Sequence, residues 1–202
     1  MLGLPKLTEM SKLLPKKAIY TKFHMNTAEK EKIDTDISKM TIVNEVSSEK
    51  IHIAEGKKVK SFFVMNIALK RKNFNESTII TISKLIPQNL ILILEYENEA
   101  KLAIYHTKLI QTEWKVKETL TIQMKGVDMD SVWDNIIIQV GSIQLEEGNT
   151  LEEQIEINGK RLKIEKKIAR LEKQARNEKQ PRKKFELVQQ IKKLRIEMEG
   201  LI

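Results

Sequence analysis

The chain of 202 residues is 41% apolar and 32% charged, which is enough apolar material for one domain of ordinary size plus a more polar segment. It contains no cysteine, which excludes disulfides, thiolate nucleophiles, cysteine-ligated zinc and iron–sulfur clusters. The net charge of +8 is uneven, because residues 1–159 carry 21 Lys+Arg against 22 Asp+Glu while residues 160–202 carry 15 against 6.

Two short helices followed by three strands are predicted for the first third of the chain. A helix over residues 8–14 is expected to be capped by a threonine and ended by a proline, and a second helix to begin at Thr27. Runs of β-branched or alternating residues over 41–46, 51–53 and 59–69 predict three adjacent strands. Short polar segments separate these runs, as in a meander.

A βαβ crossover is predicted next. Asn75 is a favourable cap for a helix over 76–86, which Pro87 ends before the apolar run 90–94. Because an unbroken apolar strand is usually buried on both faces, this strand should lie in the sheet centre and parallel to the strand before the helix.

An antiparallel strand is predicted over 100–105, after a turn, followed by strands near 110–115 and 119–124. A helix should then start at Asp128 or Asp130, with its apolar residues turned inward. These elements predict an α/β (α+β) fold, a mixed β-sheet with covering helices. Its expected core includes Phe63, Met65, Ile67, Leu92, Leu94 and Ile137.

The C-terminal segment predicts a helical hairpin or coiled coil. In a long helix over 150–176, apolar residues recur at alternating spacings of four and three. A breaker ends this helix, and Pro181 suits the first turn of a second amphipathic helix. We therefore predict a mixed α/β domain over 1–147 and a basic antiparallel hairpin over 148–202. A straighter helix kinked at the proline, and pairing of these helices between two chains as a homodimer, remain open alternatives.

The excess positive charge of the hairpin makes it the first candidate for a binding site. A basic surface attracts nucleic acid, anionic membranes or acidic partners, although such a face can also be simply solvated. With Phe185 as the hairpin's one aromatic residue, contacts to nucleic acid would be made to the backbone, without base stacking. The candidate binding residues are Lys163, Lys166, Lys167, Arg170, Lys173, Arg176, Arg182, Lys183, Lys184, Lys192, Lys193 and Arg195.

Signals for catalysis are weak. A metal-dependent nuclease would use carboxylates to hold magnesium and a lysine to steady the attacking water, and the nearest approach is Glu97, Glu99 and Lys101 beside a hairpin turn. The three histidines fall on separate segments, and there is no phosphate-binding loop or dinucleotide fingerprint. We expect neither a cofactor nor a metal ion.

The location that we expect is the cytoplasm. The first six residues lack the basic-then-apolar order of a secretion signal. No apolar run approaches the roughly 18–20 residues of a membrane span, so we expect no membrane association.

Several short motifs resemble those of a known family. They are Leu2-Gly3-Leu4-Pro5, Leu14-Pro15-Lys16-Lys17, Leu85-Ile86-Pro87, Glu95-Tyr96, Tyr105, Glu178-Lys179-Gln180 and Phe185-Glu186-Leu187. In these residues the chain resembles, over nearly its whole length, a bacterial family of unknown function, DUF4391. Its members are often encoded beside helicases and DNA methyltransferases in mobile or defence loci, so the resemblance implies a helicase or methyltransferase as partner protein. It implies no catalytic residue.

Together these observations predict a non-catalytic accessory protein of a bacterial DNA-processing or anti-phage defence locus. Its basic coiled-coil tail would bind a partner protein or, without sequence preference, the nucleic-acid backbone. A metal-dependent nuclease using Glu97, Glu99 and Lys101 is the alternative.

Overall fold

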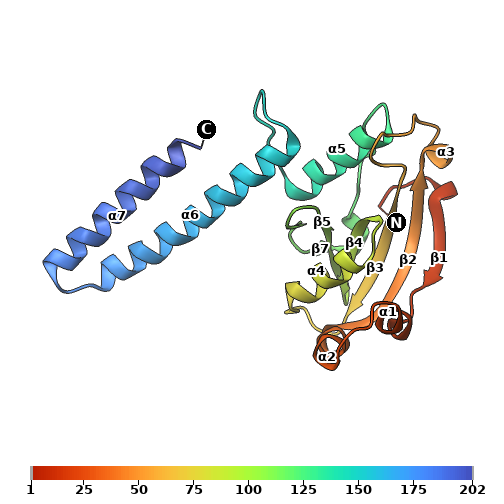
Figure 1. The fold of residues 1–202 in the computed structure, drawn as a ribbon, viewed down its shortest axis with the longest axis horizontal. Coiled ribbons are helices and arrows are strands. Elements are labelled where there is room, and N and C mark those ends of the chain that lie inside the picture. Colours follow the sequence, from red (N-terminus) through yellow and green to blue (C-terminus); the bar gives the residue numbers. More distant parts are fainter. Residues whose placement is uncertain (1, 202) are drawn as a thin grey trace. The chain divides into compact units, whose positions relative to one another are not determined.

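The computed structural model describes residues 2–201, which form two units that divide between Ile143 and Gln144. The first unit is an α+β domain built on a mixed sheet, and the second contains a pair of long helices (Figure 1). The boundary predicted from the sequence, between residues 147 and 148, lies in the segment that leads into the first of these helices, α6 (Leu151–Asn177).

The sheet of the first unit has seven strands within the described residues. Its strand order is β1-β2-β3-β4-β5-β6, with β7 paired to β5, and all neighbours are antiparallel except β3 and β4. The strands are β1 (Glu9–Leu13), β2 (Ile37–Ser47), β3 (Ser61–Leu69), β4 (Asn89–Tyr96), β5 (Glu99–Tyr105), β6 (Leu109–Gln111) and β7 (Lys115–Val116). The predicted mixed sheet is therefore confirmed.

The βαβ crossover predicted from the sequence is present. Strands β3 and β4 run parallel, and helix α4 (Glu76–Leu85) connects them. Asn75 caps this helix, since its side chain accepts a hydrogen bond of 3.0 Å from the backbone N–H of Ser77. Residues 90–94 of β4 are all buried, as expected for a strand covered on both faces.

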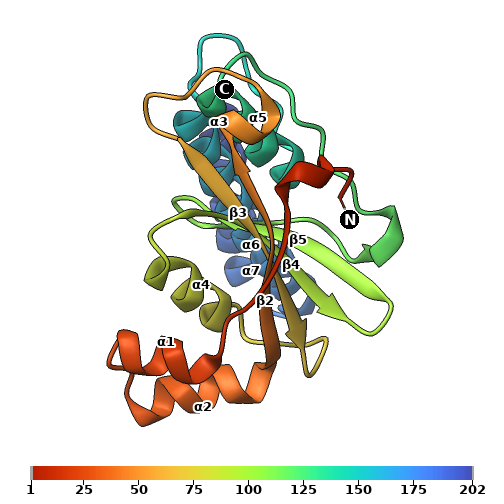
Figure 2. The same cartoon turned by 90° about the vertical axis from the view of Figure 1, so that its right-hand side faces the viewer.

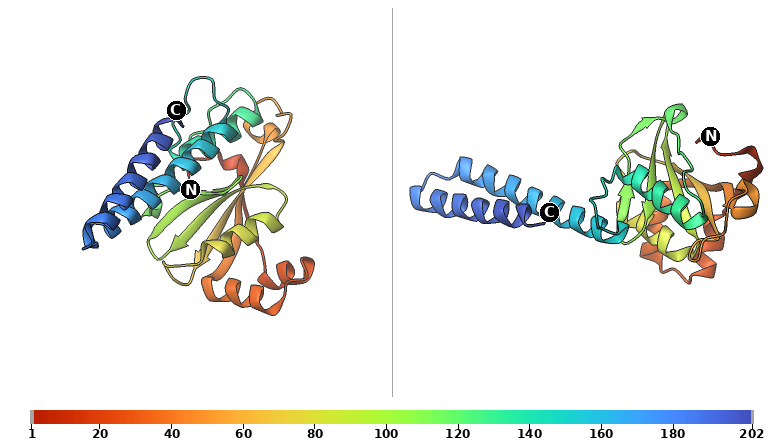
Figure 3. Two further views of the ribbon diagram at one scale, coloured as in Figure 1. Left: turned by 60° about the vertical axis from the view of Figure 1, so that its left-hand side comes forward. Right: turned by 90° about the horizontal axis from the view of Figure 1, so that it is seen from above.

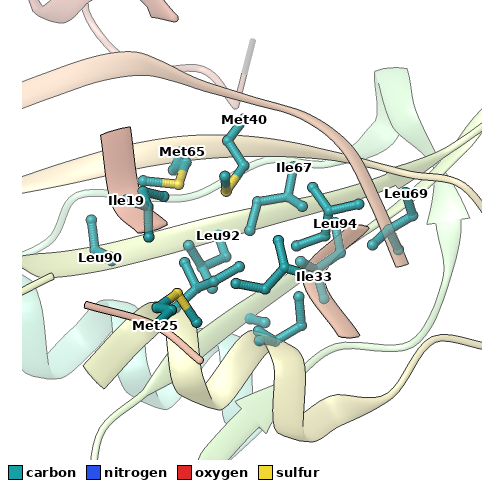
Figure 4. Packing of buried hydrophobic residues seen from close by; sticks show 14 residues of the cluster. Ile19, Met25, Ile33, Met40, Met65, Ile67, Leu69, Leu90, Leu92 and Leu94 are labelled. Carbon is teal, nitrogen blue, oxygen red and sulfur yellow. The ribbon is translucent and has the colours of Figure 1, made fainter. Parts of the chain in front are cut away.

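Helices cover both faces of the sheet. On one face, α1 (Lys16–Lys22), α2 (Thr27–Asp36) and α4 contribute to an apolar cluster with β2, β3 and β4. Figure 2 shows α1 and α2 beside each other at one end of β2, and Figure 4 shows the packed side chains. On the other face, Trp133 of α5 (Met129–Gly141) packs on Phe62, with 5.4 Å between the ring centroids.

Most of the predicted core residues are confirmed. Met65, Ile67, Leu92, Leu94 and Ile137 are fully buried. Phe63 is only partly buried, whereas its neighbour in the chain, Phe62, is 0% exposed and lies under α5. Phe63 lies on the same face of β3 as Met65 and Ile67, because alternate strand residues point to one side, but it packs only partly covered against the cluster there.

A buried carboxylate fixes the junction between α2 and β2. Asp36, which is 1% exposed, accepts hydrogen bonds from Arg71, from the Thr78 hydroxyl and from the backbone N–H of Asn75. Burial alone would raise the pKa of Asp36, but these hydrogen bonds outweigh burial and hold the pKa below its usual range. The ionised carboxylate therefore ties together α2, α4 and the segment after β3.

The predicted helix over residues 8–14 is wrong. A 3₁₀ helix (Lys6–Thr8) is followed by β1, which pairs with β2 at the sheet edge. The Thr8 hydroxyl donates to the Pro5 carbonyl at 2.7 Å and accepts from the side chain of Asn44 at 2.9 Å. Strand pairing has overridden a local pattern that favoured a helix.

The predicted strand over 51–53 is also wrong. Ile51 is the last residue of a short helix, α3 (Ser48–Ile51), and His52, which ends this helix, adopts a left-handed conformation with φ of 55°. The adjacent Ala54 makes an isolated bridge to Asp128, so the segment touches the start of α5 rather than the sheet.

The strand predicted over 119–124 is replaced by a 3₁₀ helix (Lys117–Thr119) and a single bridge. Thr121 pairs in parallel with Leu2, and the backbone N–H of Ile122 donates to the Leu2 carbonyl at 3.0 Å. Two segments that are far apart in the sequence are joined at this point.

Helices α6 and α7 (Pro181–Glu199) confirm the predicted hairpin. They lie side by side and run in opposite directions (Figure 3). Their seam, which we define by its buried members, consists of Ile164, Ile168, Leu171, Ile191 and Leu194. No helix within residues 2–201 has the length and apolar character needed to cross a membrane.

Candidate functional site

The strongest candidate site is the outer surface of the hairpin. The seam residues are buried between the helices, and the charged residues in the intervening positions face outward. Four large apolar side chains also face outward, namely Leu162, Phe185, Val188 and Ile196. All twelve basic residues predicted to bind are exposed, namely Lys163, Lys166, Lys167, Arg170, Lys173, Arg176, Arg182, Lys183, Lys184, Lys192, Lys193 and Arg195.

Few of these cations are neutralised by neighbouring carboxylates. Arg195 pairs with Glu172 at 2.9 Å, and Arg182 approaches Glu186 at 3.6 Å. Within the part of the chain that the structure describes, no ion pair is formed by the other ten. Their charge is therefore accessible to a partner.

The basic residues on α6 form a continuous line. Lys163, Lys166, Arg170 and Lys173 follow one another at spacings of three and four residues, so they share one side of the helix, turned away from the seam. At a rise of about 1.5 Å per residue they extend over about 15 Å. We call these four residues the α6 basic line.

The base of the hairpin is acidic and firmly held. Thr150 caps α6 in a reciprocal capping box with Glu153. Arg161 of α6 pairs with Glu146, before this helix, at 3.0 Å and donates to the carbonyl of Leu201, after α7, at 3.2 Å. These contacts give the helices that carry the cations a defined geometry.

A groove of about 650 Å³ lies near the connection between the two helices. Its lining includes Arg170, Lys173 and Lys183, but also the carboxylates of Glu178 and Glu186. Arg170 and Lys173 belong both to the groove and to the α6 basic line, and the two carboxylates weaken the attraction of the groove for an anion.

The residues of the nuclease hypothesis lie around the β4–β5 turn. Glu97 occupies the turn with φ of 53°, while Glu99 and Lys101 lie two residues apart on one face of β5. The Glu99 carboxylate is paired with Lys72. Among residues 2–201, no group of three or more histidine or acidic side chains could hold a metal ion. The nuclease hypothesis stays a prediction.

Lys101 lies in a setting that sequence reasoning missed. It is 9% exposed, and its ammonium group lies 4.9 Å from the ring centre of Phe74 and 5.2 Å from that of Trp114. Burial lowers its pKa, while Glu76 and Glu113 act in the opposite direction. Cation–π contacts explain how the charge is held. The available signal was a lysine within the apolar run of residues 100–104.

A mixed-sheet α+β domain joined to a helical hairpin is thus the class of protein that the structure defines. The model of a family described as a domain of unknown function (DUF4391) matches residues 2–198, so the chain belongs to this family. No curated protein matches the chain, and neither does any solved structure.

Proposed function

We propose that the hairpin binds the phosphate backbone of nucleic acid and that the chain acts as a non-catalytic accessory protein. The observation that carries this proposal is the exposure of all twelve basic side chains on two helices that the buried seam holds together. An ordered array of mostly unpaired cations releases the counterions condensed on nucleic acid, which favours binding.

The composition of the hairpin supports recognition without sequence preference. Stacking on bases needs aromatic side chains, and the hairpin offers only Phe185, which is 63% exposed on α7. Lysine and arginine side chains on a regular helix suit contacts to phosphates, which position a protein but do not read sequence.

The proposal extends to the biological setting. Resemblance to the family implies a bacterial DNA-processing or anti-phage defence locus, with a helicase or methyltransferase as the partner of the α/β domain. In this setting the hairpin would add affinity for DNA to an enzyme that supplies the chemistry.

The test is titration of duplex DNA with the full chain at several salt concentrations. The triple variant Lys166→Gln/Arg170→Gln/Lys173→Gln removes three charges from the α6 basic line. We expect weaker binding and a shallower dependence of log K on log salt, by about 0.9 for each phosphate that the variant no longer neutralises.

A matched control removes the same charge from the α/β domain. Lys57→Gln/Lys58→Gln/Lys60→Gln changes three exposed lysines in a loop whose backbone is held by hydrogen bonds to Asp130. This control should keep the wild-type affinity and salt slope. Equal losses of DNA affinity in both variants would show that binding depends on net charge and not on the α6 basic line. An affinity that does not change with salt concentration would refute the proposal.

The nuclease alternative has a separate test. Magnesium-dependent cleavage of duplex DNA by the full chain, lost in the Glu99→Ala variant, would replace the accessory proposal by an enzyme. Because Glu99 lies outside the hairpin, this variant should leave DNA binding unchanged under the accessory proposal.

A further inference from the structure

A second candidate site lies on the first unit, where a pocket of about 510 Å³ opens between β1, α1 and the sheet. Its floor is formed by Phe63, Met65 and Leu90 of β3 and β4. Ile19 of α1 and Phe23, directly after α1, form a wall. Figure 4 shows Ile19, Met65 and Leu90 at one end of the apolar cluster. The pocket therefore continues the core of the domain out to its surface.

The lining is mostly apolar and incompletely covered. Leu14, Phe23, Ile42, Phe63 and Ile86 pack against the buried cluster yet are only partly buried themselves. Small-molecule sites are usually apolar cavities of about 300–1,000 Å³ with a few polar groups that orient the ligand. The volume and lining of this pocket fall in that class.

The charged groups around the pocket are predominantly positive. The Lys22 ammonium lies 5.4 Å from the ring centre of Phe23, which places it at the rim, and Lys12 belongs to the lining as well. Glu45 is the one acidic residue of the lining, and its carboxylate pairs with Lys50 at 2.8 Å. Two lysines thus remain to meet an anion.

We infer that this pocket binds a small amphipathic carboxylate. The apolar chain or ring of the ligand occupies the space above Phe63, Met65 and Leu90, and its carboxylate lies between Lys12 and Lys22. Burial of the chain gives affinity in proportion to the apolar area removed from water, and the lysines select the charge. The flexible thioethers of Met10 and Met65 let the lining adapt to chains of different shape.

Decanoate is the probe for this inference, and decyltrimethylammonium, with the same chain and the opposite charge, is its counterpart. Both are titrated into the full chain below the concentration at which they form micelles, by calorimetry and by thermal melting. We expect decanoate to bind and to raise the melting temperature with concentration, as a ligand specific for the folded state does. Decyltrimethylammonium should do neither.

Two variants locate the binding. Lys12→Gln/Lys22→Gln should weaken decanoate binding at least tenfold, whereas Lys6→Gln/Lys17→Gln, which removes the same charge from exposed positions outside the lining, should not. Ala18→Trp fills the mouth of the pocket from the exposed side of α1 and should abolish binding without unfolding the domain. Circular dichroism of each variant checks the fold.

The inference would be overturned by the absence of heat and stabilisation with decanoate, by equal binding of the cationic probe, or by undiminished binding of decanoate to Ala18→Trp. Equal losses in the lysine pair and in its control would also do so, because the carboxylate would then be responding to overall charge.

Discussion

The α/β domain and the hairpin both close by apolar packing, but to different depths. Met65 and Leu92, in the sheet, are 0% exposed, whereas Ile168 and Leu194, in the seam, are both 9% exposed. A sheet between two layers of helix can enclose side chains completely, while two helices can bury only one stripe each. The domain therefore has a deep core that specifies its fold, whereas the hairpin has a shallow seam and leaves the outer sides of its helices exposed.

The two regions also use charge differently. Asp36 of the domain is buried and receives hydrogen bonds from several groups, so its charge serves the fold. In the hairpin the charges are exposed and mostly unpaired. Substitutions of charged residues should therefore change stability in the domain and binding in the hairpin.

Among the substitutions that test this comparison, Leu92→Ala should lower the free energy of unfolding most. The substitution leaves a cavity in a fully buried strand and should cost about 2–5 kcal/mol of unfolding free energy. Urea and thermal denaturation measure it. An unchanged melting temperature would contradict the central position of β4.

Asp36→Asn should have the second-largest effect and lower the free energy of unfolding by about 2–3 kcal/mol, because it weakens charge-assisted hydrogen bonds to a buried group. Asp34→Asn is the control, since Asp34 is about half exposed and its pair with Lys16 should contribute less than about 1 kcal/mol.

The same carboxylate predicts a dependence on pH. Because the folded-state pKa of Asp36 is lowered, its contribution is complete above its unfolded-state pKa of about 3.9 and is lost as the pH falls through the lower folded value. Denaturation measured across this acid range should show a smaller loss in Asp36→Asn than in wild type. Parallel curves would contradict the assignment.

Ile168→Ala should lower the free energy of unfolding of the hairpin by about 2 kcal/mol. This is the low end for such substitutions, because the thin seam can partly close around the gap. Amide hydrogen exchange should accelerate in α6 and α7 and stay unchanged in β3 and β4. Faster exchange throughout the sheet would show that the two units unfold as one.

Thr150→Ala should have the smallest effect, about 1 kcal/mol, since it removes one cap of α6. The expected result is faster exchange in the first turns of α6 alone. Thr150→Ser, which retains the capping hydroxyl, should behave like wild type.

The sequence predicted elements well where local signals and tertiary packing agree. Asn75 and Asp128 cap the helices that were expected to start there, and the apolar run of β4 lies in the sheet centre. Prediction from the sequence failed where local signals and tertiary packing disagree. Residues 9–13 contain good helix formers, yet β2 offers them an unpaired edge, and pairing with a distant strand leaves no trace in local propensity.

The candidate sites also divide into those that the sequence predicted and those that it did not. The hairpin cations were predictable, because periodicity gives the seam and the seam determines what is exposed. The aromatic contacts of Lys101 were not, because Phe74 and Trp114 lie on other segments of the chain. The pocket beside α1 also escaped prediction, since its wall depends on how that helix lies against the sheet.

The bridge between Leu2 and Thr121 imposes an order on events during synthesis. Ribosomes add about 5–20 residues per second, so on the order of 6–24 s separate the emergence of these two partners. Strands β2 and β3, which are close in sequence, can pair long before the Leu2 carbonyl meets its donor, the backbone N–H of Ile122. Leu2 is thus among the last residues of the first unit to be fastened, and a nascent chain stalled before Thr121 would have β1 paired with β2 but Leu2 without its partner.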